Sequence, residues 1–103
     1  MTRIIRQILN IIQYTFSKNL SEDSLAYERL LTHLKFFVQR IMLGRTLSDD
    51  NIELFALIRK SYPKEYECAL KIKEYVFKET KHTLSIPEMA YIMIHINRVI
   101  NDN

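Results

Sequence analysis

The chain has 103 residues, of which 48% are hydrophobic and 26% are charged, and its formal net charge is +3. This composition is that of a globular protein and excludes a disordered chain, while the length allows one domain and excludes two ordinary ones. With one glycine and two prolines, the sequence has too few turn-forming residues for a β-sandwich or barrel and favours long helices.

The first half of the chain predicts two amphipathic helices. Isoleucines at three- and four-residue spacing predict a helix over about residues 2–18. The polar stretch SKNLSEDS interrupts this pattern, and its Ser21 or Asp23 is placed to cap a second helix over about residues 24–43. Gly44 suits the C-terminal cap of that helix. Its predicted apolar face consists of Leu30, Leu34, Phe37, Val38 and Ile41.

The next two predicted helices follow without a long loop. Ser48 is placed to cap a helix over about residues 49–61, and the two aspartates after it lie at the positive end of the helix dipole. Pro63 suits the first turn of a fourth helix over about residues 63–79.

The last helix has the clearest start signal. Ser85 and Glu88 have the spacing of a capping box, with Pro87 inside the first turn, and they open a helix over about residues 86–101. No internal repeat or low-complexity segment is present. The sequence therefore predicts an all-α fold, a compact five-helix bundle in a single domain spanning residues 1–103.

Two histidines lie on the apolar sides of these helices. His33 lies among the leucines and phenylalanines of RLLTHLKFF, and His95 among the isoleucines of AYIMIHINRVI. Arg29 precedes His33 by four residues and Arg98 follows His95 by three, which places each arginine beside its histidine on the helix surface. We expect these four side chains to converge on one polar pocket. His82, in the polar stretch TKHTLS, is expected to be exposed to solvent.

Several roles are open to such a histidine pair. Each histidine alone is more often a buried residue that bonds to a carbonyl or hydroxyl. Metal binding is disfavoured because no H-x-x-x-H motif or carboxylate at helical spacing accompanies them, and no cofactor is indicated. A catalytic triad lacks a placed nucleophile, and no glycine-rich turn could cradle a nucleotide. The chemistry that remains is phosphoryl acceptance by His33 and His95, with Arg29 and Arg98 stabilising the phosphate.

The remaining features point to no other class of protein. Cys68 is the single cysteine and cannot form an internal disulfide, which favours the reducing cytoplasm; we expect it to be a small buried hydrophobe. Neither a signal peptide nor a membrane span is visible. The lysines and arginines are dispersed, which is weak support for nucleic-acid binding.

Three stretches, SLAYERLLTHLKFFVQRI, YPKEYECALKIKEYV and LSIPEMAYIMIHINRV, resemble the PTS regulation domain (PRD) of bacterial transcriptional antiterminators of the BglG/SacY/LicT type. The resemblance covers almost the whole chain, in order and at the spacing of the family. Such proteins carry two tandem copies of the domain. In first copies the residue before the leading histidine is commonly Asp, so Thr32 makes this chain more similar to a second copy.

The resemblance implies a bundle of two antiparallel helix pairs plus one peripheral helix, which forms a homodimer. It implies a non-enzymatic regulatory domain that is phosphorylated by the sugar phosphotransferase system, through the phosphocarrier protein HPr or a sugar permease. The acceptor histidines of the family match His33 and His95, although some relatives replace the second. In intact proteins the modification controls dimerisation, and thereby RNA binding by a separate N-terminal domain and antitermination.

The sequence leaves the parent protein open. The chain lacks the RNA-binding domain and the other PRD, and Met1 opens directly on the first helix, so we expect a fragment of a longer regulator and assign no RNA binding to it. The same domain also occurs in DNA-binding activators of sugar operons. Two further alternatives are a constitutive helical dimerisation module with structural histidines and a small acid–base enzyme that uses the histidine pair.

Overall fold

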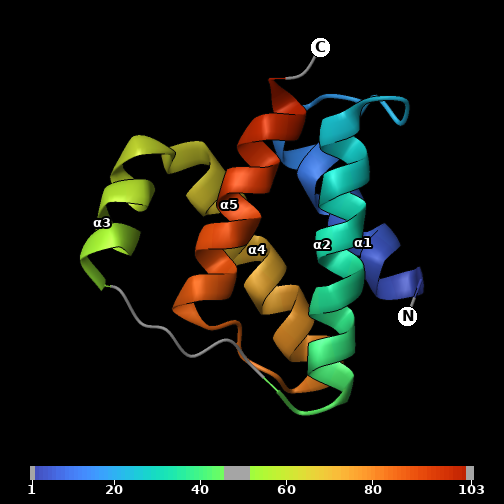
Figure 1. Ribbon diagram of the computed structural model, residues 1–103, viewed down its shortest axis with the longest axis vertical. Coiled ribbons are helices and arrows are strands. Elements are labelled where there is room, and N and C mark those ends of the chain that lie inside the picture. The colour runs from blue at the N-terminus through green and yellow to red at the C-terminus, as the bar shows by residue number, and fades with distance from the viewer. Residues whose placement is uncertain (1, 46–51, 102–103) are drawn as a thin grey trace.

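The computed structural model describes residues 2–45 and 52–101, and within these ranges the chain forms five α-helices and no strand (Figure 1). This confirms the predicted all-α fold. No helix in these ranges combines the length and hydrophobicity that a membrane span requires. The helices are α1 (Thr2–Phe16), α2 (Leu25–Met42), α3 (Ile52–Ser61), α4 (Pro63–Thr80) and α5 (Ile86–Ile100).

The start of α2 differs from the prediction. Its N-cap is Ser24, whose side-chain oxygen accepts a hydrogen bond of 3.1 Å from the backbone N–H of Tyr27. The prediction of Ser21 or Asp23 as the cap was therefore wrong. Ser24 has the extended backbone that an N-cap requires, whereas the carbonyl of Ser21 accepts the backbone N–H of Ser24 in a turn that precedes the helix.

A residue with a left-handed backbone follows three of the helices within two positions. Ser17 has a φ of 50°, and α1 therefore ends at Phe16, two residues before the predicted end at residue 18. Gly44 has a φ of 67° and follows α2, as predicted from its freedom to adopt positive φ. Lys81, with a φ of 64°, follows α4. These left-handed residues stop each helix within one turn of its predicted end.

The remaining helix starts agree with the sequence where the structure describes them. The predicted cap Ser48 and the aspartates after it lie outside the described residues, so α3 is described only from Ile52. Pro63 lies in the first turn of α4. At the start of α5 the side chain of Ser85 accepts from the Glu88 N–H, and the side chain of Glu88 accepts from the Ser85 N–H, at 3.4 and 3.3 Å. The predicted capping box is present.

The five helices form two antiparallel pairs and one peripheral helix, as the resemblance implied. Helices α1 and α2 form one pair and α4 and α5 the other; α2 packs on α5, and α1 on α4 (Figure 1). Helix α3 lies at the edge, against α4 and α5. The side-chain ammonium of Lys18, just after α1, donates to the carbonyl of Ile100 at the end of α5 and ties the two pairs together.

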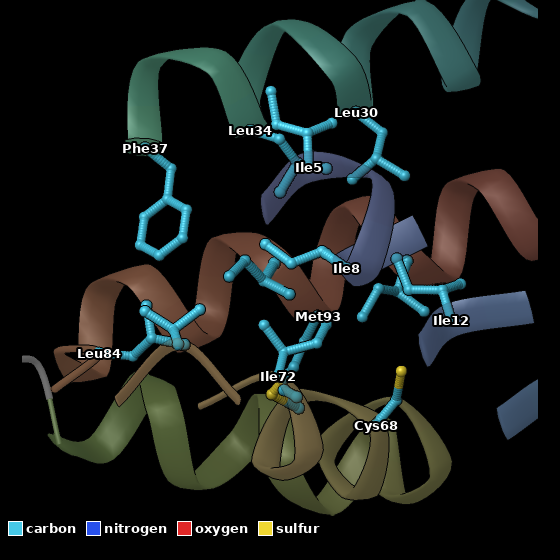
Figure 2. Packing of buried hydrophobic residues seen from close by; sticks show 14 of the residues in the cluster. Ile5, Ile8, Ile12, Leu30, Leu34, Phe37, Cys68, Ile72, Leu84 and Met93 are labelled. Carbon is cyan, nitrogen blue, oxygen red and sulfur yellow. The ribbon is translucent and has the colours of Figure 1, made fainter. Parts of the chain in front are cut away.

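The core lies between α1, α2, α4 and α5 (Figure 2). The apolar face predicted for the second helix is entirely buried, which confirms that prediction. Cys68 is also fully buried, and burial raises the pKa of its thiol to about 11, so it is the inert core residue that we expected. Figure 2 shows side chains of the four helices meeting in this core, among them Leu30, Leu34, Phe37, Ile8, Ile12, Ile72 and Met93.

The capping box of α5 gives a stability prediction. Ser85→Ala removes the acceptor for the Glu88 N–H, and we expect the free energy of unfolding to fall by about 1 kcal/mol. Ser61→Ala, at the exposed end of α3, is the matched control and should change it by less than about 0.5 kcal/mol. Urea denaturation measures both. Equal midpoints for the two variants would show that the box does not stabilise the fold.

Candidate functional site

The imidazole rings of His33 and His95 lie against each other between α2 and α5. Their ring centroids are 4.8 Å apart and the ring planes differ by 28°, which is a stacked arrangement. Tyr91, one turn before His95, adds a third ring whose centroid lies 5.9 Å from that of His33. The structure therefore brings together the two histidines that the sequence analysis expected to converge.

The register of α2 against α5 explains why these rings meet. His33 and Arg40 are seven residues apart on α2, and Glu88 and His95 are seven residues apart on α5. Seven residues make about two helical turns, so both members of each pair lie on one face of their helix. Because the helices run antiparallel (Figure 1), His33 meets His95 at one level and Arg40 meets Glu88 about two turns away.

The Arg40–Glu88 ion pair is the second polar level of this interface. Arg40 Nε lies 3.4 Å from Glu88 Oε2, and the side chains are 23% and 3% exposed. The Glu88 carboxylate also accepts from the hydroxyl of Ser85 at 3.0 Å. The sequence analysis missed this pair. The sequence does contain a signal for this pair. Arg40 follows His33 by seven residues, Glu88 precedes His95 by seven, and the two residues have opposite charges.

Two buried nitrogen atoms of the interface lack a hydrogen-bond partner within the described part of the chain. They are Nε2 of His33 and Nη2 of Arg40. A buried polar atom without a partner costs about 1–3 kcal/mol relative to a paired one. The interface therefore keeps hydrogen-bonding capacity on both histidine and arginine that the described contacts do not use.

A cavity of about 400 Å³ opens beside the histidine pair. Both imidazoles border it, and so does Arg29, one of the two predicted phosphate-stabilising residues. Arg98, the other, is not among the residues that line it. Within residues 2–45 and 52–101, no group of three His, Cys, Asp or Glu side chains is placed to hold a metal ion. The cavity is lined by Leu25, Glu28, Arg29, Thr32, His33, Phe36 and His95.

Burial and neighbouring positive charges keep both imidazoles neutral near pH 7. Burial is the largest cause that lowers the pKa of His33 from 6.5 to about 4, and the charges of His95 and Arg40 lower it further. Burial is also the largest cause that lowers the pKa of His95, and the charges of Arg98 and Arg29 lower it further. A neutral imidazole retains the nitrogen lone pair that attacks phosphorus. The effect of both arginines on His95 also means that both positive charges act on that imidazole.

His82 lies apart from the histidine pair. Its side chain is partly buried rather than exposed as predicted, and it borders a small cavity with Arg45 and Glu88. The physical reason is that the short connection from α4 to α5 packs back on the end of α2, where Leu84 is only 4% exposed. His82 thus belongs to the level of the Arg40–Glu88 pair and not to that of the stacked imidazoles.

The low pKa of His33 predicts a pH dependence of stability. Between pH 6.5 and about 4 the unfolded chain binds a proton at His33 that the folded chain does not, so stability is lost as the pH falls through this window. His33→Gln removes this titration. After allowance for partial exposure, we expect the wild type to lose about 1–2 kcal/mol more than the variant between about pH 7 and pH 4.5.

Urea denaturation at the two pH values measures this difference. His82→Gln is the matched control, and it should lose stability in acid as the wild type does. Parallel pH profiles for the wild type and His33→Gln would mean that His33 titrates normally in the folded protein.

Comparison with known proteins identifies relatives along nearly the whole chain. The PRD domain model matches residues 6–99, which include both histidines. Transcription antiterminator LicT of Bacillus subtilis is 38% identical over 100 residues, covering 97% of this chain and 36% of that protein. The beta-glucoside operon antiterminator of Dickeya chrysanthemi is 39% identical over 101 residues, 96% of this chain and 35% of that protein. Protein GlcT of Staphylococcus saprophyticus is 25% identical, over 93% of this chain and 34% of its own length. The chain thus spans about a third of the length of these relatives.

Proposed function

The chain belongs to the PRD domain family of transcriptional antiterminators, and from this premise we propose that it is a regulatory domain that accepts a phosphoryl group on histidine. The proposed acceptors are His33 and His95. The observation that carries the proposal is the stacked pair of neutral imidazoles, 4.8 Å apart, beside a cavity that Arg29 borders. The proposed donor belongs to the sugar phosphotransferase system, either the phosphocarrier protein HPr or a sugar permease.

The transfer we propose runs from a phosphohistidine of the donor to an imidazole of this chain. The lone pair of the acceptor nitrogen forms a new N–P bond while the N–P bond of the donor breaks. The acceptor ring gives up a proton to solvent, and the donor ring takes one up. Arg29 and Arg98 stabilise the negative charge of the phosphoryl group, since guanidinium groups bind phosphate oxygens in pairs. No turnover of a substrate is involved, so the domain is proposed as a regulator and not as an enzyme.

A phosphoryl group at this place has a direct effect on packing. It adds up to about two negative charges and several oxygen atoms between rings that are in contact. The rings must then separate, or the surface around the cavity must rearrange. We propose that this change controls a symmetric homodimer of the domain. In the cytoplasmic full-length regulator it would thereby control RNA binding through another domain, and antitermination.

Two alternatives to this proposal are a DNA-binding activator as the parent protein and a dimerisation module with structural histidines. The curated relatives described above are named as antiterminators or as GlcT, which favours an antiterminator parent over a DNA-binding activator. A dimerisation module with structural histidines is favoured by the stacking contact itself, because that contact stabilises the α2–α5 interface without any modification. Phosphotransfer separates this alternative from the proposal.

Phosphotransfer is therefore the test of the proposed function. Incubation with the phosphorylated carrier protein should give the domain an acid-labile label. His33→Ala should remove most of the label and His95→Ala part of it, because each removes one acceptor ring. His82→Ala is the matched control and should keep the full label. Full labelling of the double His33/His95 variant would overturn the assignment.

The proposed coupling to dimerisation is tested by sedimentation. We expect the domain to form a homodimer whose interface buries more than about 1,000 Å² in total. His33→Asp and His95→Asp place a fixed negative charge at the site and should each change the dimer dissociation constant by more than about twofold. A monomer at high micromolar concentration, or an unchanged dissociation constant in both variants, would contradict the coupling.

A further inference from the structure

We infer that Arg40 is a positioning residue that responds to phosphorylation: a phosphoryl group on His33 draws its guanidinium away from Glu88 and so loosens the start of α5. The inference rests on the proposed function only in that it requires a phosphoryl group on His33. The role of the Arg40–Glu88 ion pair is separate from the phosphate stabilisation proposed for Arg29 and Arg98. The first turn of α5 is the part of the fold that changes first.

The first support is the unused hydrogen-bonding capacity of the interface. Arg40 contacts Glu88 through Nε at 3.4 Å, at the long end of hydrogen-bond distances, while its buried Nη2 has no partner within the described residues. Nε2 of His33 is buried and unpartnered in the same way. A phosphoryl group carries three strong acceptor oxygens. Bound to His33, it would supply the acceptor that the Arg40 guanidinium lacks.

The second support is the direction of the Arg40 side chain. Arg40 follows His33 by seven residues, so both side chains leave α2 on the same face. Side chains on an α-helix lean toward its N-terminus, and that direction points the long Arg40 side chain back toward the turn that carries His33.

The third support is electrostatic. The Arg40 charge already acts on the His33 ring, since it is one of the causes that lower the pKa of His33. The neutral ring carries no net charge that attracts Arg40, whereas a phosphoryl group on the ring would carry up to about two negative charges that do. Arg29 and Arg98 are exposed, whereas the Arg40 side chain is only 23% exposed. Its attraction to the new charge is therefore less screened by water and salt.

The consequence falls on the first turn of α5. Glu88 forms the capping box with Ser85, and its side chain is 3% exposed. When Arg40 moves, this buried carboxylate loses a charged partner and its cost of burial rises. Among the described residues that line the small cavity beside Glu88, His82 and Arg45 are also positively charged or titratable. We expect the capping box to open more often, and with it the hydrogen bonds of the first turn.

The experiment uses potassium phosphoramidate, which phosphorylates histidine without a protein donor. The unprotonated imidazole nitrogen forms an N–P bond, the N–P bond of the reagent breaks and ammonia leaves, and the ring then gives up its one N–H proton to solvent. Mass spectrometry locates the label on His33. Amide hydrogen exchange, followed by NMR, then reports on the backbone N–H groups of Glu88 and Met89, which bond to the hydroxyl and the carbonyl of Ser85.

We expect the change in amide exchange on phosphorylation to require Arg40. In the phosphorylated wild type the amides of Glu88 and Met89 should exchange at least about fivefold faster than in the unmodified protein. In Arg40→Met the ion pair is already absent, so exchange should be fast before labelling and change by less than about twofold after it. Lys35→Met is the matched control: it removes an exposed positive charge from the same helix, away from the cavity lining, and should respond to labelling as the wild type does.

Two further variants keep the test decisive. If Arg40→Met does not fold, Glu88→Gln removes the charge that competes for Arg40 and should likewise abolish the response. His33→Asp supplies a fixed negative charge without any reagent and should speed the exchange of the same two amides. Unchanged exchange in the labelled wild type, or an equal response in Arg40→Met, overturns the role of Arg40.

The outcome is separable from that of the proposed function. A domain that the carrier protein labels, but whose α5 amides do not respond, retains the proposed function and refutes this inference. A domain that only phosphoramidate labels, with the Arg40-dependent response intact, supports this inference and refutes the proposed donor.

Discussion

The antiparallel packing of α2 on α5 is the constraint on which the rest of the structure depends. The two helices share a register in which His33 meets His95 and Arg40 meets Glu88. Apolar stripes alone would tolerate a slip of one turn, because leucine and isoleucine pack acceptably in several registers. A one-turn slip here would bury the charges of Arg40 and Glu88 apart from each other, at a cost of several kcal/mol. The polar levels therefore fix where the apolar residues meet.

The same constraint gives the site its chemical character. Because the rings are held in the helix interface rather than on a loop, they are partly desolvated and stay neutral near pH 7, as the low pKa of His33 shows. Their edges still border an open cavity. Any change in the charge or size of either ring would therefore act on two long helices at once. The same change in a histidine on a surface loop would have no such effect.

The sequence predicted what depends on local pattern. The buried face of α2, the capping box of Ser85 and Glu88, and the turn at Gly44 each follow from residues within a few positions of one another. The cap of α2 did not follow, because several polar residues precede that helix and the choice of Ser24 depends on the turn before it. The Arg40–Glu88 pair and the partial burial of His82 depend on how separate helices meet, which no single helical pattern contains.

The peripheral place of α3 has a consequence for how the domain comes apart. Among residues 53–61 of α3 no side chain is fully buried, and the helix packs along α4 and α5. The fully buried residues of the core come from outside α3, which contributes only the partly buried Phe55 and Ile58 within residues 53–61. Elements with few buried contacts open at lower free energy than the global transition. Helix α3 should therefore unfold as a separate cooperative unit before the rest of the domain. We also expect its sequence to vary more among related proteins than the sequences of the four core helices.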